Sequence, residues 1–346
     1  MLSKIIEQEK IDHCAKWFDK AKRVVIVSHL SPDGDALGSS LGMLHVLHEM
    51  HKEVTVIVPN EYASFLSWMP AIKEVVLYNK YPDFSQQLID AADVICCFDF
   101  NDLKRIGDLG KLVEASSARK LLVDHHLNPT DFCEIMISHP EISSTSELVF
   151  RLICRMGFYD LLSKEAAECI YTGMMTDMGS FTYNSNREDI YFIIGRLLKK
   201  GIDKDDIYRR VFNNYSENRI RLMGFMLYKK LKVYSDVHAA LMTFSQEEQE
   251  QFNFIKGDAE GFVNLPLSVS GIRFSAFFRE DKEQGMIKIS LRSVGSFPCN
   301  QVAGTYFNGG GHLNASGGEF TGTLEEAVAQ FEKALEAYTE LLVAEE

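Results

Sequence analysis

The chain has 346 residues, of which 46% are hydrophobic and 25% charged, a balance typical of a globular protein. This length exceeds one ordinary core and predicts two domains. There is no run of about 18 apolar residues, so no membrane span is expected. The charged, amphipathic N-terminus also lacks the apolar core of a secretory signal.

The formal net charge is −13. A protein that holds long nucleic acid through many phosphate contacts usually presents a basic surface, so no long nucleic acid is expected as a partner. A small anionic substrate stays compatible with this charge, because local arginines or metal ions can overcome a diffuse field.

The seven cysteines form no C-x-x-C pair, and two adjacent ones, Cys96 and Cys97, lie in an apolar run. An odd, unpatterned set of cysteines in a large chain is typical of reduced thiols. We therefore expect a cytoplasmic protein.

Short apolar runs in the first half predict buried strands that alternate with helices. The strands are expected at 23–28, 53–58, 93–100 and 120–123, and helices at 37–50, 146–156 and 164–176. Such alternation favours an α/β fold with a mainly parallel sheet and helices on both faces.

The middle of the chain predicts helices without a strand partner. Ser185 and Glu188 have capping-box spacing, and Lys199-Lys200-Gly201 is a typical helix end. A further helix is expected at 216–233. We therefore predict a catalytic domain at 1–186, a helical connector at 187–234, and a smaller mixed α/β domain at 235–346.

In this last domain the pattern predicts a strand at 237–244 and a hairpin formed by 272–279 and 286–292. Capping boxes are expected at Ser245 with Glu248 and at Thr323 with Glu326, where the final helix begins.

Polar side chains with metal-binding chemistry follow three of the predicted strands and one helix. They are His29, Asp33, Asp35, Asp99, Asp124, His125, His126 and Asp177. Because the carboxyl ends of parallel strands share one edge of a sheet, we expect these residues to converge on one crevice.

The combination favours a pair of divalent cations. Carboxylates suit hard cations, and imidazole shifts the preference from Mg²⁺ toward Mn²⁺. Two ions about 3.5–4 Å apart can clamp both oxygens of a phosphoryl displacement. A single aspartate after a strand is more often a helix cap, but a buried strand ending in Asp-His-His has no structural rationale, since three adjacent polar groups need partners.

These segments resemble a known family. HLSPDGDALGSSLG, FDFND, LLVDHH and TGMMTDMGSF are similar, in order and spacing, to the four motifs of the DHH phosphoesterases. GGGHLNASGGEF, preceded by KISLRS, resembles the glycine-rich signature of the DHH-associated C-terminal domain. The resemblance spans nearly the whole chain.

The resemblance implies a role for each residue. His29 and Asp33 hold one Mn²⁺; Asp35, His125 and Asp177 hold the other; and Asp99 bridges them, with Mg²⁺ or Co²⁺ as substitutes. His126 contacts the scissile phosphate, and Asp124 orients a metal-binding histidine.

The second domain is expected to hold the substrate. Gly309, Gly310 and Gly311 let the backbone approach an anion, and His312 adds a donor or a stacking face. Arg292, at the end of a strand, can bind a phosphate with two hydrogen bonds, and Arg279 is a weaker candidate. A glycine triplet by itself is more often a plain loop, so this prediction depends on Arg292 and on the resemblance.

The resemblance implies a cytoplasmic enzyme that degrades RNAs of two to five nucleotides to mononucleotides and converts pAp to AMP by two-metal hydrolysis. Family members are often homodimers. Three alternatives stay open: a phosphodiesterase for c-di-AMP or its linear product pApA, a processive RecJ-type exonuclease, and a non-enzymatic RNA-binding module like the tail of alanyl-tRNA synthetases.

Overall fold

The computed structural model describes residues 3–255 and 257–344. The chain forms two compact units, Met1–Asn214 and Tyr215–Glu346. The division between them falls inside the segment 187–234 that the sequence predicts as one connector, and its helices are shared between the two units.

The first unit contains a six-stranded sheet with the order β3-β2-β1-β4-β5-β6, and all its strand pairs are parallel. Its strands are β1 (Arg23–Val27), β2 (Glu53–Val58), β3 (Val76–Leu77), β4 (Val94–Phe98), β5 (Arg119–Asp124) and β6 (Ile135–Ser138). Every residue of β4 is buried, as expected for a central strand covered on both faces.

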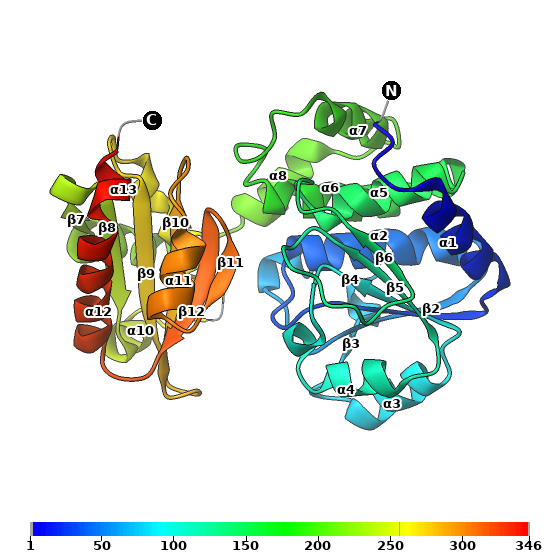
Figure 1. Ribbon diagram of the computed structural model, residues 1–346, viewed down its shortest axis with the longest axis horizontal. Coiled ribbons are helices and arrows are strands. Elements are labelled where there is room, and N and C mark those ends of the chain that lie inside the picture. Colours follow the sequence, from blue (N-terminus) through cyan, green and yellow to red (C-terminus); the bar gives the residue numbers. More distant parts are fainter. Residues whose placement is uncertain (1–2, 256, 345–346) are drawn as a thin grey trace. The chain divides into compact units, whose positions relative to one another are not determined.

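Helices cover both faces of this sheet (Figure 1). They are α1 (Gln8–Lys20), α2 (Gly34–Glu49), α3 (Pro82–Asp90), α4 (Leu109–Ala115), α5 (Thr145–Arg155) and α6 (Lys164–Asp177). Helix α7 (Glu188–Leu198) packs on α5 and α6, and α8 (Lys204–Phe212) packs on α6. Val24 and Ile26 of β1 pack with α2, α5 and α6, whereas Val25 and Val27 pack with α3 and α4. The predicted α/β fold is therefore confirmed.

Helices α2 and α6 pack closely through glycine. A Cβ atom added to Gly38 would lie 2.6 Å from the carbonyl oxygen of Cys169 and 2.8 Å from the Cα of Gly173. No side chain fits between the helices there, so this contact fixes α6 against α2.

The helices after α6 differ from the sequence prediction. The predicted capping box at Ser185 and Glu188 is wrong, because the Ser185 hydroxyl donates to the Phe181 carbonyl and α7 begins only at Glu188. The helix predicted at 216–233 is shorter. It consists of α9 (Glu217–Phe225) and a π-helical turn (Met226–Lys230), and a strand follows. Helix α8 was not predicted.

The second unit contains a mixed sheet with the order β11-β12-β10-β9-β8-β7. Its strands are β7 (Lys232–Tyr234), β8 (Ala239–Phe244), β9 (Phe274–Asp281), β10 (Met286–Ser293), β11 (Gly310–His312) and β12 (Ala315–Phe320). Strands β8 and β9 are parallel, and the other neighbours are antiparallel. The predicted hairpin of β9 and β10 is confirmed.

The helices of the second unit are α9 together with α10 (Gln246–Gln251), α11 (Cys299–Tyr306), α12 (Leu324–Ala337) and α13 (Thr339–Val343). One face of the sheet packs against α11 and α12, and the other packs against α9 and a 3₁₀ helix at Phe262–Ser268. Both predicted capping boxes, Ser245 with Glu248 and Thr323 with Glu326, are present.

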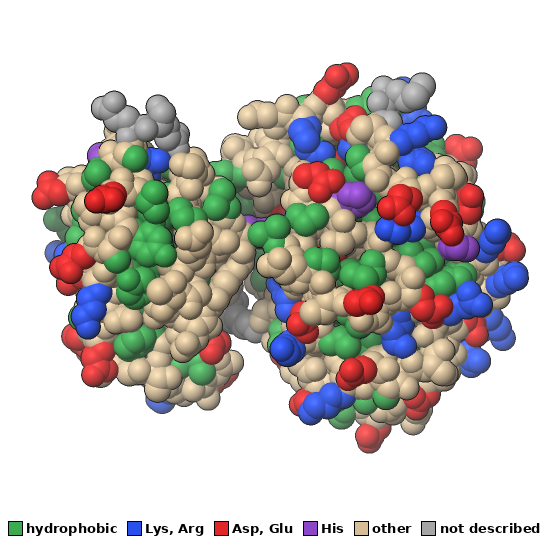
Figure 2. All heavy atoms as spheres, in the orientation of Figure 1, with side chains coloured by type: hydrophobic (Ala, Val, Ile, Leu, Met, Phe, Trp, Pro, Cys, Tyr) green, Lys and Arg blue, Asp and Glu red, His purple; other side chains and the backbone are tan. Residues whose placement is uncertain are grey.

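Within the described residues, no helix is both long enough and apolar enough to cross a membrane. All seven cysteines are free thiols, as the sequence predicts. Figure 2 shows acidic side chains interspersed with lysines and arginines over the visible face of the first unit.

Candidate metal centre

The first unit brings all eight candidate metal-centre residues to the carboxyl end of its sheet. His29 follows β1, Asp33 is the N-cap of α2, Asp35 lies in the first turn of that helix, and Asp99 directly follows β4. Asp124 is the last residue of β5, so His125 and His126 follow it, and Asp177 is the last residue of α6. The predicted convergence thus results from strand order in a parallel sheet and from the close packing of α2 on α6.

His29, Asp33 and Asp99 form a first group whose ligand atoms lie close enough to share a cation. The Nε2 atom of His29 is 3.4 Å from an Asp99 oxygen and 3.9 Å from an Asp33 oxygen. Its Nδ1 atom is 2.9 Å from the carbonyl oxygen of Leu30, which fixes the ring with Nε2 toward the carboxylates.

Asp35, His125 and Asp177 form a second group of the same kind. The Nε2 atom of His125 is 3.5 Å from Asp177 Oδ2 and 3.9 Å from Asp35 Oδ2. The Nδ1 atom of His125 is 3.1 Å from the carbonyl oxygen of Ile142, so a backbone group orients this ring too.

Asp99 lies between the two groups. Its Oδ2 atom faces His29 Nε2, and its Oδ1 atom is 3.6 Å from His125 Nε2. Each oxygen of this one buried carboxylate therefore faces a different histidine, which is the arrangement that a bridging ligand requires.

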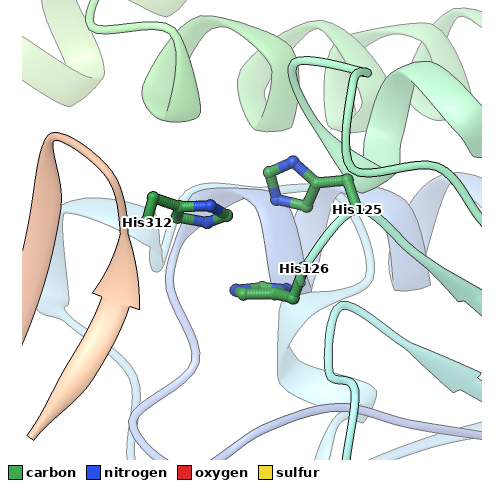
Figure 3. A group of neighbouring side chains, drawn as sticks. All are labelled: His125, His126 and His312. Atoms are coloured by element: carbon green, nitrogen blue, oxygen red, sulfur yellow. The ribbon is translucent and has the colours of Figure 1, made fainter. Parts of the chain in front are cut away.

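Asp124 and His126 form a pair beside these groups. Asp124 Oδ1 is 2.7 Å from His126 Nδ1, and Asp124 Oδ2 accepts from the backbone N–H of His126. Figure 3 shows the His125 and His126 rings on consecutive residues after β5; it also labels His312, which belongs to β11 of the second unit. The rings meet edge to face with centroids 4.9 Å apart. Asp124 therefore orients His126, whereas the sequence analysis assigned it to a metal-binding histidine.

The N-terminus of α5 supports two of the carboxylates. The backbone N–H groups of Thr145 and Ser146 donate to Asp35, at 2.6 and 2.9 Å, and the Thr145 hydroxyl donates to Asp99 at 2.9 Å. Helix N-termini favour negative charge, so α5 stabilises the cluster of carboxylates. The sequence analysis missed Thr145 and Ser146. The Ser-Ser-Thr-Ser run at 143–146 marks the start of this helix, but no pattern along the chain connects it with Asp35.

The electrostatics of the cluster favour bound positive charge. Burial and the neighbouring charges of Asp99 and Asp177 raise the pKa of Asp35 well above its ordinary value. Burial opposes protonation of His125, but Asp177, Asp99 and Asp35 outweigh it and raise the pKa of this histidine to about 9. Burial likewise opposes ionisation of Asp99, but a hydrogen bond from His29 and the nearby histidines keep its pKa below the ordinary range.

The residues present fit divalent cations. Both histidines are oriented by backbone carbonyls so that Nε2 faces carboxylate oxygens. Buried carboxylates at such distances repel one another unless a cation or proton lies among them. Mixed carboxylate and imidazole ligands suit Mn²⁺ and similar ions.

The residues predicted to hold substrate lie in the second unit and are separated into two places on its sheet. Arg292 and His312 both pair with Ala315 of β12, so they lie in register on either side of that strand. Arg279 pairs with Lys288, four residues along β10 from Arg292, which is about 13 Å along a strand. Arg279 also faces Asp281 at 3.5 Å and lies over the ring of Phe254, so it is not brought together with Arg292.

The glycine triplet has a structural reason of its own. A Cβ atom on Gly309 would lie 1.9 Å from the Gly317 carbonyl oxygen, and Gly311 has a φ of 140°. Close approach of β11 to β12 thus requires glycine at these two positions, whereas a Cβ atom on Gly310 would meet nothing within 4 Å.

Two family domains account for most of the chain. The DHH family, N-terminal domain matches residues 23–174, and the DHHA1 domain matches residues 235–342. With both domains matched, this chain belongs to the DHH family, whose members are phosphoester hydrolases.

Three individual proteins are similar to most of this chain. The chain is 28% identical to the bifunctional oligoribonuclease and PAP phosphatase NrnA of Bacillus subtilis (strain 168), with 85% of this chain and 88% of that protein covered. A crystal structure of an exopolyphosphatase-related protein from Bacteroides fragilis is 63% identical, covers 99% of this chain and 100% of its own, and has a TM-score of 0.96. The cyclic-di-AMP phosphodiesterase GdpP of Bacillus subtilis is 24% identical over 95% of this chain, which spans 50% of that protein.

Proposed function

We propose that the chain is an Mn²⁺-dependent phosphoesterase that degrades RNAs of two to five nucleotides to mononucleotides and converts pAp to AMP. The observation that carries this proposal is the buried Asp99 carboxylate, whose two oxygens face His29 and His125 of separate ligand groups. The similarity to NrnA supports the choice of substrates.

In this proposal His29 and Asp33 hold one Mn²⁺, Asp35, His125 and Asp177 hold the other, and Asp99 binds both. Bound divalent ions supply Lewis-acid stabilisation of the charge that develops on the phosphoryl oxygens. Backbone carbonyls hold the two histidine rings, and α5 holds Asp35 and Asp99, so the ligands are positioned before a substrate arrives.

His126 is proposed to contact the scissile phosphate. Its Nδ1 atom is engaged by Asp124, which directs the opposite nitrogen, Nε2, away from that carboxylate. Nε2 is then the nitrogen that can contact a phosphate oxygen, and Asp124 fixes the orientation of the ring.

The second unit is proposed to bind the remainder of the substrate. Arg292 and His312 lie in register across β12, two strand spacings or about 10 Å apart. A guanidinium and an imidazole carried on backbone positions at this separation suit a nucleotide phosphate and an adjacent base or sugar. Arg279 lies too far along β10 to join them, and its neighbour Asp281 satisfies its charge.

The test is hydrolysis of a labelled dinucleotide, a pentanucleotide, an RNA of roughly 24 nucleotides and pAp, each with Mn²⁺ and with EDTA. Rates should fall with RNA length, because a chain of net charge −13 repels long polyanions. Inorganic polyphosphate belongs in the panel because of the exopolyphosphatase-related structure. Failure to release mononucleotides or phosphate from the shortest RNAs and pAp with Mn²⁺ refutes the proposal.

The second candidate is a phosphodiesterase for c-di-AMP or pApA, which the similarity to GdpP favours. Side-by-side hydrolysis of c-di-AMP and pApA discriminates between the two. Cleavage of pApA alone agrees with the leading proposal, whereas faster cleavage of the cyclic form favours this second candidate.

We also propose that the enzyme acts in the cytoplasm as a homodimer. The free thiols support a reducing compartment. Sedimentation of the purified protein tests the dimer, and cell fractionation tests the location.

A further inference from the structure

A crevice lies at the amino end of the first unit's sheet, where β1, β4 and β5 begin. It has a volume of about 600 Å³, within the range of about 300–1,000 Å³ that small-molecule sites occupy. Its lining includes His13, Lys16, Trp17, Lys20, Asp93 and Arg119. The metal centre lies at the opposite ends of the same strands, which are about 16 Å long.

Helix α1 supplies one wall. His13, Lys16, Trp17 and Lys20 recur at intervals of three and four residues and so share one face of the helix. The opposite face of α1 packs into the core through Ile11, Cys14 and Phe18. Trp17 also packs partly against this core, whereas His13, Lys16 and Lys20 are exposed and core packing does not require them.

The lining is basic although the chain is acidic. The lining contains three cationic side chains, Lys16, Lys20 and Arg119, and one carboxylate, Asp93. The Oδ2 atom of Asp93 already accepts hydrogen bonds from the backbone N–H groups of Lys22 and Arg23, both at 2.8 Å. Within the described residues, none of the three cations has an ion-pair partner within 4.0 Å. Scattered solvated lysines are ordinary on a surface, but here three unpaired cations line one hollow of a protein whose net charge is −13.

An aromatic surface accompanies the cations. The guanidinium of Arg119 lies 5.1 Å from the ring centroid of Trp17, and the indole is half-buried in the wall. A base can stack on an indole or on a guanidinium, and such stacking tolerates any base. Lysines beside it suit the phosphate of the same molecule.

We propose that this crevice is a second ligand site, separate from the metal centre, that binds a nucleoside monophosphate. Trp17 and Arg119 hold the base, and Lys16 and Lys20, with a ring N–H of His13, hold the phosphate. A free anion would use the lysines alone, and a nucleoside would use the aromatic wall alone.

Trp17 itself can report on binding, because Trp17 and Trp68 are the two tryptophans of the chain. We would titrate the full-length Trp68→Phe protein in EDTA with AMP, with inorganic phosphate and with adenosine, following Trp17 fluorescence. EDTA removes metal, so the carboxylates of the metal centre repel AMP, and the measurement does not depend on hydrolysis or on the proposed function.

AMP should change the fluorescence with a saturable curve, and phosphate and adenosine should each bind more weakly. Lys16→Gln/Lys20→Gln should weaken AMP binding about tenfold or more, because two charge-assisted hydrogen bonds are lost. Lys10→Gln/Lys22→Gln is the matched control. It removes the same charge from lysines that pair with Glu7 and Glu53 outside the crevice, and AMP affinity should not change.

Absence of a saturable change with AMP would overturn the site. Equal AMP affinity in the two double variants would overturn the role of the lysines, and with it the proposal. Phosphate or adenosine binding as tightly as AMP would overturn the assignment to a nucleotide. Melting curves of both double variants check that a lost signal does not come from unfolding.

Discussion

At the scale of single residues, the hydrogen bond between Asp124 and His126 has the clearest consequence. Asp124 is fully buried and its two oxygens both face His126, one at the ring and one at the backbone. His139 and Glu141 form a similar pair on the surface, with 2.9 Å between Nδ1 and Oε1. The two pairs thus share their chemistry and differ in burial and place.

Asp124→Asn should reduce kcat by about 10–100-fold, because an amide can donate as well as accept a hydrogen bond and so no longer fixes the tautomer and orientation of the His126 ring. Glu141→Gln makes the same chemical change in the exposed pair and should leave kcat within about twofold. Steady-state kinetics on pAp with Mn²⁺ measure both. A similar loss in both variants would contradict the assigned role of Asp124.

Thr145 gives a second prediction at this scale. Thr145→Val removes the hydroxyl that donates to Asp99 and should weaken Mn²⁺ binding by about 10–100-fold. Thr172→Val is the control, since the Thr172 hydroxyl is also buried but donates to the Glu168 carbonyl within α6. Mn²⁺ titration by calorimetry compares the two, and equal affinities would show that Thr145 does not support the centre.

At the scale of elements, the packing of α2 on α6 connects stability with metal binding. Asp33 and Asp35 lie at the N-terminus of α2 and Asp177 at the C-terminus of α6. The glycine contact at Gly38 holds these helix ends at a fixed separation.

Gly38→Ala should therefore destabilise the first unit by about 1–3 kcal/mol, since the new methyl group meets backbone that cannot move aside. It should also weaken Mn²⁺ binding. Gly195→Ala, in α7, is the control, because a Cβ atom there meets nothing within 4 Å. This substitution should raise the free energy of unfolding by about 0.5–1 kcal/mol. Thermal melting with and without Mn²⁺ measures both effects. A Gly38→Ala protein with the melting temperature and the Mn²⁺ stabilisation of the wild type would refute the packing argument.

The same local spacing predicted one helix start correctly and another wrongly. Thr323 with Glu326 and Ser185 with Glu188 have the same spacing, yet only the first forms a capping box. The second fails because the chain before it turns through Ser180, Phe181 and Asn184, all with positive φ, and Ser185 bonds back to Phe181. A spacing rule contains no information about such a turn.

At the scale of the whole molecule, strands β1, β2, β4 and β5 could be predicted because each is a short apolar run, whereas the edge strands β3 and β6 were not predicted. The same strand order predicts that polar residues after β1, β4 and β5 meet. The boundary at Asn214 and the support from α5 could not be predicted, because both depend on contacts between distant segments. Thr145 is 110 residues from Asp35, to which its backbone donates.

The two units should respond differently to metal, since the proposed Mn²⁺ ligands all lie in the first. Mn²⁺ at about 100 times its Kd should stabilise that unit by about 2.7 kcal/mol, and EDTA should reverse the effect. Calorimetric melting of wild type and Asp99→Asn tests this prediction. A rise in melting temperature that persists in the variant would mean that the stabilising ions bind elsewhere.

The backbone conformation at Asp99 determines which substitution can inactivate the enzyme without straining its loop. Its φ is 66°, in the left-handed region that asparagine and aspartate enter more readily than other side chains. Alanine there would strain the loop as well as remove the carboxylate, so a lost activity would have two explanations. Asparagine keeps the size and the backbone preference, while it removes the charge and replaces one carboxylate oxygen by an NH2 group. Asp99→Asn is thus the suitable substrate trap: a protein for soaking or co-crystallising uncleaved dinucleotides, in which the bound ligand itself can identify the natural substrate.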